Sequence, residues 1–196
     1  CLTATTGADG KYLLLFVYPG EQTLVASPSS GSLLQASVPV TVTSGVTQTV
    51  DVQLTEGATI TASIIADDFP ESTSLELWRD YGEGNGYVRF GYIEGNGSWD
   101  FAALQPGDYF IKARPNTIDF ADEYVPDSLT QEGAQRFSVG AGDTVDVVIE
   151  LDRSAMIDVT VNGPAGKPVD YAEVIAYPSF APYSARIDYP WCWIAT

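Results

Sequence analysis

Residues 45–64 read GVTQTVDVQLTEGATITASI, and residues 142–161 read GDTVDVVIELDRSAMIDVTV. The two stretches align without a gap at an offset of 97 residues, from residue 45 to residue 142. In both, apolar residues alternate with polar ones at a period of two, which is typical of β-strands that bury one face. The apolar positions coincide at Val50/Val147, Val52/Ile149, Leu54/Leu151, Ala58/Ala155 and Ile60/Ile157. The sequence therefore predicts an all-β protein built from a repeated unit.

A second pair of stretches repeats the turns that join these strands. Residues 9–28 align with residues 96–115 without a gap, at an offset of 87 residues, from residue 9 to residue 96. The alignment places Pro19-Gly20 on Pro106-Gly107, and such pairs are typical of tight turns. Because the offsets of 97 and 87 differ by ten, the second copy must contain a ten-residue insertion, which we expect near residues 118–127.

The acidic composition excludes two classes of partner. The 196 residues include 9 Lys and Arg against 26 Asp and Glu, for a net charge of −17. Such a surface repels nucleic acid and anionic lipid, whose counterions it cannot replace. No stretch approaches the ~18 consecutive apolar residues of a membrane span. We therefore expect no nucleic acid partner, no membrane insertion, and an extracellular or cell-surface location.

The sequence contains no histidine. Histidine is the commonest general base, the central member of the Ser-His-Asp arrangement and a ligand in nearly all catalytic zinc sites. We therefore expect a protein that is not an enzyme, with no catalytic residue and no organic cofactor.

Three sets of turn residues carry a resemblance to a known family. They are Asp9-Gly10-Lys11-Tyr12 with Pro19-Gly20, Asn96-Gly97-Ser98-Trp99 with Leu104-Gln105-Pro106-Gly107-Asp108-Tyr109, and Gly166-Lys167-Pro168-Val169. In this pattern the chain resembles the carboxypeptidase regulatory-like domain, a seven-stranded transthyretin-like (prealbumin-like) β-sandwich related to the Cna B-type repeats of surface adhesins. The resemblance implies tandem sandwiches of this kind. Since the matched residues are mostly turn residues, it implies a fold and no activity.

Aligned in this way, the chain holds one complete domain flanked by two partial ones. Residues 55–151 form the complete sandwich, and residues 1–54 supply only its third to seventh strands. Residues 152–196 supply only the first two strands and an approach to the third. The complete domain is expected to have strands near 58–66, 74–80, 87–94, 98–104, 108–114, 135–140 and 143–151.

The two partial domains are complementary. Residues 152–196 and 1–54 together make 99 residues, against 97 in residues 55–151. Half a sandwich leaves a sheet face and its edges open. We therefore expect residues 152–196 to be completed by residues 1–54 of the next unit, either along a longer repetitive chain or between subunits joined by strand complementation. The alternative is a truncation of a multi-repeat protein at arbitrary points.

The two cysteines, Cys1 and Cys192, would lie close together at such a junction. A disulfide bond across it is one interpretation. Two buried thiols are a second, and a lipid-modified Cys1 is a third, although a lipoprotein would not sensibly begin inside a domain.

Two groups of acidic residues are candidates for calcium ligands, because carboxylate oxygens are the ligands that Ca²⁺ prefers. The first lies in the expected insertion and comprises Asp119, Asp122, Glu123 and Asp127. The second comprises Asp67, Asp68 and Glu71. Neither matches a defined calcium loop, so solvated surface charge is the alternative interpretation.

Aromatic residues are concentrated near the C-terminus, at Tyr183, Tyr189, Trp191 and Trp193. They could stack on sugar rings or pack into the junction between units. Asn96-Gly97-Ser98 fits a glycosylation sequon, although Asn-Gly is also a preferred turn pair.

These patterns predict a structural repeat of an extracellular filament, stalk or surface layer that assembles head-to-tail with itself. The alternatives are a carbohydrate-binding or adhesive surface module and an accessory domain of a larger secreted enzyme.

Overall fold

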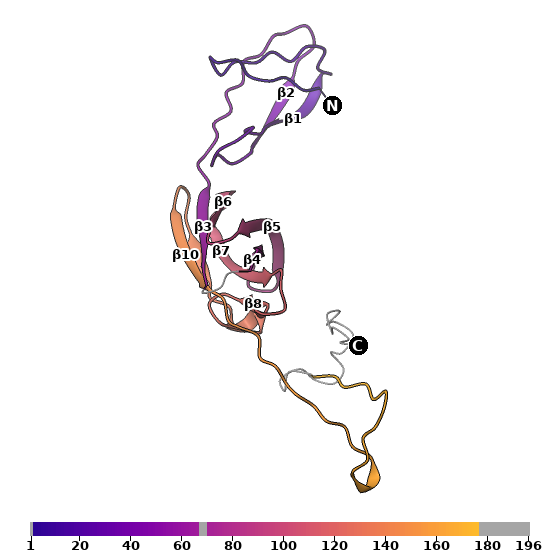
Figure 1. Cartoon of the computed structure of the whole chain (residues 1–196). Helices are drawn as coiled ribbons and strands as arrows, with labels where there is room; N and C mark the ends of the chain where they lie inside the picture. The colour runs from indigo at the N-terminus through magenta and orange to yellow at the C-terminus, as the bar shows by residue number, and fades with distance from the viewer. Residues whose placement is uncertain (1, 67–69, 177–196) are drawn as a thin grey trace. The chain divides into compact units, whose positions relative to one another are not determined.

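The regular elements of the chain are β-strands, as the alternating pattern predicts. A computed structural model describes residues 2–66 and 70–176 (Figure 1). The strands are β1 (Gly20–Ala26), β2 (Ala36–Val42), β3 (Ala58–Ile65), β4 (Ser72–Asp80), β5 (Asn85–Glu94), β6 (Ser98–Leu104), β7 (Gly107–Pro115), β8 (Glu123–Tyr124), β9 (Phe137–Val139) and β10 (Thr144–Glu150). Two short 3-10 helices, η1 (Gln131–Gly133) and η2 (Pro164–Gly166), complete the elements of this part of the chain. The prediction of an all-β fold is confirmed. Within the described ranges, no helix has the length and apolar character needed to cross a membrane.

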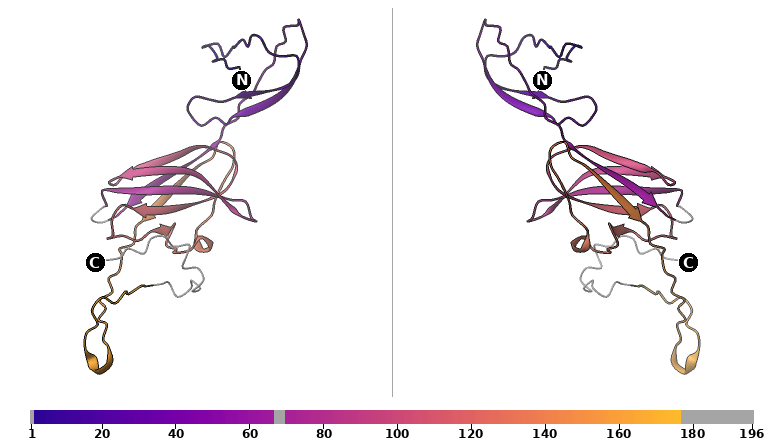
Figure 2. Two further views of the ribbon diagram at one scale, coloured as in Figure 1. Left: turned by 90° about the vertical axis from the view of Figure 1, so that its right-hand side faces the viewer. Right: turned by 90° about the vertical axis from the view of Figure 1, so that its left-hand side faces the viewer.

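Residues 58–150 form two sheets that share one core. The first sheet has the order β10-β3-β6, and the second has the order β5-β4-β7-β8, with β9 also paired to β7. β10 runs parallel to β3, and β6 runs antiparallel to it. Figure 2 shows these strands from two opposite sides. β3–β7, β9 and β10 lie at the seven strand positions expected from the sequence, whereas the two-residue β8 was not expected.

Alternation of apolar and polar residues explains how the core is filled. In β3 the buried positions are Ala58, Ile60, Ala62 and Ile64, at 0–2% exposure, and the residues between them are partly exposed. Their side chains join one cluster with residues of the second sheet, including Leu75 and Ile111. Successive side chains of a strand point to opposite faces, so one face of β3 supplies the core.

The hairpin of β1 and β2 repeats the pairing of β7 and β9. Gly20 pairs with Val42, and their counterparts at offsets of 87 and 97, Gly107 and Val139, also pair. Backbone conformations recur as well. Positive φ angles occur at the matched positions Phe16 (61°) and Ala103 (52°), Gly20 (116°) and Gly107 (156°), and Gly45 (71°) and Gly142 (78°). The repeat is therefore present in strand register and in backbone conformation, and not only in sequence.

An isolated β-bridge also recurs at matched positions in the two copies, and it locates the insertion more closely. An isolated bridge joins Leu33 to Glu56, and its counterpart joins Phe120 to Arg153. Since the offset of 87 still holds at Phe120, the ten additional residues begin a few residues after the expected start at residue 118 and overlap the expected range of 118–127. They occupy the stretch between residue 121 and residue 133, which contains β8 and η1.

By contact density the chain divides into residues 1–154 and residues 155–196. In the described part of the second unit, a bridge between Asn162 and Pro168 closes a loop around η2.

A matched pair of substitutions tests the difference between the two copies. Ile111 is fully buried, whereas its counterpart Leu24 is only partly buried. We expect Ile111→Ala to lower the free energy of unfolding by about 2–5 kcal/mol. Leu24→Ala should cost about 0.5 kcal/mol or less in dilute protein, as measured by chemical denaturation. An equal cost at both positions in dilute protein would show that residues 2–54 already form a complete core.

Candidate functional site

The first candidate site comprises two stretches within residues 2–54. Each matches a strand of the central sandwich in sequence but is not paired with a strand here. In the central sandwich, β3 lies between β6 and β10 and is hydrogen-bonded to both. The positions equivalent to β6 and β10 are residues 11–17 and 47–53. These residues are described, and neither stretch contains a strand. Among the described residues 2–54, no segment corresponds to β3, the strand that separates β6 and β10 in the central sandwich.

Burial shows the consequence for the side chains. Phe101 and Leu104 of β6 are 1% exposed. Their counterparts, Leu14 and Val17, are only partly buried. Residues 2–54 therefore hold the alternating pattern of a sandwich strand without the neighbour that would cover it.

Residues 155–161 show the opposite deficiency. They carry the pattern of β3, but they form no strand, although they are described. Ile157 is 73% exposed and Val159 is 50% exposed, whereas their counterparts Ile60 and Ala62 are fully buried. An exposed apolar segment with unpaired backbone groups can pair with a strand of another chain segment.

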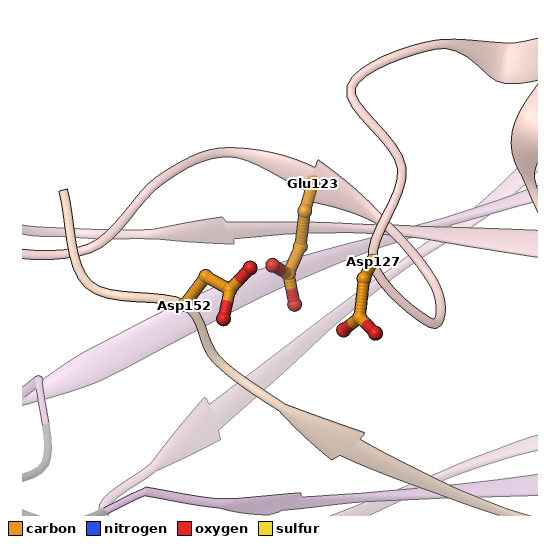
Figure 3. Close-up of side chains that lie close together, drawn as sticks. All are labelled: Glu123, Asp127 and Asp152. Atoms are coloured by element: carbon orange, nitrogen blue, oxygen red, sulfur yellow. The ribbon is translucent and has the colours of Figure 1, made fainter. Parts of the chain in front are cut away.

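The second candidate site is a group of three carboxylates. Glu123 belongs to β8, Asp127 follows it in the insertion, and Asp152 follows β10. One oxygen of each lies within 4.8 Å of those of the other two. Figure 3 shows the carboxyl group of Glu123 between those of Asp152 and Asp127.

Glu123 is the unusual member of this group. Glu123 is 2% exposed, and its Oε1 has no hydrogen-bond partner among the described residues. Burial raises the pKa of this carboxyl to about 7, a backbone hydrogen bond from Asp152 opposes the rise, and the charges of Asp152 and Asp127 add to it. Asp127 and Asp152 are exposed, so the group opens to solvent on one side.

The structure brings together only two of the four acidic residues expected to form a calcium site. Glu123 and Asp127 meet Asp152, which sequence reasoning missed. Asp119 instead accepts a hydrogen bond from the hydroxyl of Thr117. Asp122 forms ion pairs with Lys112 at 3.5 Å and with Arg114 at 3.1 Å. No local spacing signals Asp152, because it reaches β8 only through the bridge between Phe120 and Arg153.

Several other expected sites lie outside the described residues. They are Cys1 and Cys192, Asp67 and Asp68 of the second acidic group, and the aromatic residues Tyr183, Tyr189, Trp191 and Trp193. Glu71, the third member of that acidic group, is exposed, as is Asn96 of the sequon. Asn96 lies in the turn between β5 and β6, which belong to different sheets.

A row of aromatic side chains crosses the second sheet, and it too was missed. Tyr87, Trp78, Phe110 and Tyr124 lie on β5, β4, β7 and β8 in the order of the sheet. Successive ring centroids are 5.6, 6.3 and 6.1 Å apart. Phe110 is fully buried, whereas Tyr87 is 53% exposed. Local sequence patterns could not predict this row, because its members are far apart in sequence and become neighbours only through the order of the strands.

Comparison with known proteins yields only distant structural likeness. No protein-family model matches the sequence. No curated protein matches it. Among solved structures, the chain is similar to the Bacillus anthracis TIE protein, with 13% identity and a TM-score of 0.37. The match covers 85% of this chain and 34% of that protein, so the chain spans about a third of its length. At this TM-score the likeness supports no inference about function.

The buried carboxyl of Glu123 predicts a specific dependence of stability on pH. Its folded-state pKa of about 7 lies above the ordinary value of 4.5, so the folded protein holds this proton more tightly than the unfolded chain does. Without divalent cations, its contribution to stability should therefore be lost as pH rises from about 4.5 to 7. Glu123→Gln should remove this part of the pH dependence in urea denaturation at pH 5 and pH 8.

The exposed Glu94 provides the control, since Glu94→Gln should leave the difference between the two pH values unchanged. The same pH dependence in the wild-type chain and in Glu123→Gln would contradict the assignment.

Proposed function

We propose that this chain is a structural repeat of an extracellular filament, stalk or surface layer that assembles head-to-tail with itself. The observation that carries the proposal is the pair of complementary deficiencies. Residues 2–54 lack a first strand, and residues 155–161 have the pattern of a first strand without partners. In the proposed assembly, residues 155–161 of one unit lie between residues 11–17 and 47–53 of the next.

The internal repeat supplies the register of this junction. In the central sandwich Ala62 pairs with Val147 on one side and with Trp99 on the other. The equivalent partners of Val159 are Val50 and Tyr12 of the next unit. In the same way, the pairing of Ile60 with Phe101 predicts that Ile157 pairs with Leu14. Each of these predicted pairs joins residues 155–161 of one unit to residues 2–54 of the next unit.

Burial of apolar side chains provides the driving force. Ile157 and Val159 are 73% and 50% exposed, and full burial of such a side chain contributes about 1.5–3 kcal/mol. The partly buried Leu14, Val17, Val50 and Val52 gain cover at the same time. Because the two surfaces are different, the contact is heterologous, and it builds an open filament unless it closes into a ring.

The remaining properties of the proposed repeat follow from the sequence. The net charge of −17 suits a soluble extracellular protein that has no nucleic acid partner and does not enter a membrane. The turn motifs support a transthyretin-like sandwich of the carboxypeptidase regulatory-like type. A non-enzymatic role agrees with the lack of histidine in the sequence.

Cross-linking between two different chains tests the proposal. In a background with Cys1→Ser and Cys192→Ser, one chain carries Val159→Cys and the other carries Val50→Cys. After the two are mixed, a short thiol-specific cross-linker should yield a covalent dimer, because the register places the two residues on neighbouring strands with the same orientation.

The matched control replaces Val159→Cys with Thr160→Cys. A shift of one residue moves the side chain to the other face of the sheet, so this pair should cross-link much less. Equal yields for the two pairs, or the absence of a mixed dimer, would contradict the proposed junction.

Exposed aromatic side chains on β5 favour a second function, a carbohydrate-binding or adhesive surface module. Tyr87, Phe90 and Tyr92 of β5 are 53%, 53% and 41% exposed, and aromatic faces of this kind can stack on sugar rings. A glycan-array signal that Tyr87→Ala removes would favour this function. A structural repeat should give no such signal. An accessory domain of a larger secreted enzyme is the third candidate, and the full-length gene would distinguish it.

A further inference from the structure

We propose that Glu123, Asp127 and Asp152 form a calcium site that fastens the connection leaving the central sandwich to the insertion. The site is independent of self-assembly, since all three residues lie within one unit of the chain. It differs from the set expected from sequence in lacking Asp119 and Asp122 and in including Asp152.

The first argument is the uncompensated carboxylate. Glu123 is 2% exposed, and its Oε1 has no hydrogen-bond partner among the described residues. A buried carboxylate of this kind costs free energy unless it is paired or coordinates a metal ion. Lys112 and Arg114, which lie on the neighbouring strand β7, are engaged with Asp122. The carboxyl group of Glu123 instead lies between the carboxylates of Asp127 and Asp152, as Figure 3 shows.

The second argument is the chemistry and the spacing of the ligands. Carboxylate oxygens are hard ligands that suit Ca²⁺ and Mg²⁺. Two oxygens bound to one Ca²⁺ lie at most about 5 Å apart, and two bound to one Mg²⁺ lie at most about 4.2 Å apart. The three oxygens lie within 4.8 Å of one another, a spacing that one Ca²⁺ can bridge without rearrangement. Asp127 and Asp152 are exposed, which leaves room for the water ligands that complete a calcium shell.

The third argument is the position of Asp152 in the backbone. Its carbonyl oxygen accepts a hydrogen bond from the N–H of Ala121 at 3.0 Å, and the N–H of Ser154 donates to Asp119 at 2.8 Å. An ion held by Glu123, Asp127 and Asp152 would therefore tie the insertion to the stretch through which the chain leaves β10. Its effect would be to make this connection more rigid.

The chain contains a matched connection that lacks the site. At the end of the first copy, Leu34 donates to Thr55 at 2.8 Å and Gly57 donates to Ser32 at 2.7 Å. These bonds are the counterparts of those at Ala121 and Ser154. Thr55 stands at the position of Asp152, and the insertion that carries Glu123 and Asp127 is missing there. Calcium should therefore act on the second connection and not on the first.

Titration calorimetry of the full chain with CaCl₂ at constant ionic strength tests the site. We expect Glu123→Gln and Asp152→Asn each to weaken binding of Ca²⁺ at least tenfold. Asp119→Asn is the control, because Asp119 lies nearby but outside the group, and it should bind like the wild-type chain. Equal binding by all four proteins, tighter binding of Mg²⁺ than of Ca²⁺, or no binding to the wild type would overturn the proposal.

Amide hydrogen exchange supplies a readout that does not depend on the variants. Calcium should slow the exchange of Ala121 and Ser154 at least severalfold and leave Leu34 and Gly57 unchanged. Slowing of both pairs alike, or of neither pair while Ca²⁺ is bound, would show that the ion does not act at this connection.

Discussion

The pairing of β3 with a neighbour on each side organises the sandwich of residues 58–150. In the complete copy, β3 is hydrogen-bonded to β10 on one side and to β6 on the other, and it places four buried side chains in the core. Backbone groups at a sheet edge have no partner unless another strand supplies one. Among residues 2–54, the positions equivalent to β6 and β10 are not in strands, and the hairpin of β1 and β2 is the sheet described there.

Sequence patterns predicted the all-β fold and the strand positions because both depend on local chemistry. Alternation of apolar residues located β3 and β10, and the pair Pro106-Gly107 located the turn before β7. The insertion was expected a few residues too early, since the alignment alone gave no marker between Pro115 and Gly133. The recurring bridge at Phe120 corrected it.

The candidate site was only partly predictable, for a different reason. Glu123 and Asp127 were found because they are close in sequence and acidic. Asp152 is distant in sequence, and it joins them only because the chain leaving β10 pairs with the stretch before β8. The aromatic row across β5, β4, β7 and β8 depends in the same way on strand order, which local patterns do not specify.

Amide hydrogen exchange of residues 155–161, measured over a range of protein concentrations, tests the central claim most directly. If these residues complete the sandwich of another unit, the amides of Ile157 and Val159 should exchange rapidly in dilute protein and become strongly protected as the concentration rises. Rapid exchange at every concentration would contradict complementation. Protection that persists on dilution would show that the strand is completed within its own chain, which would contradict assembly between units.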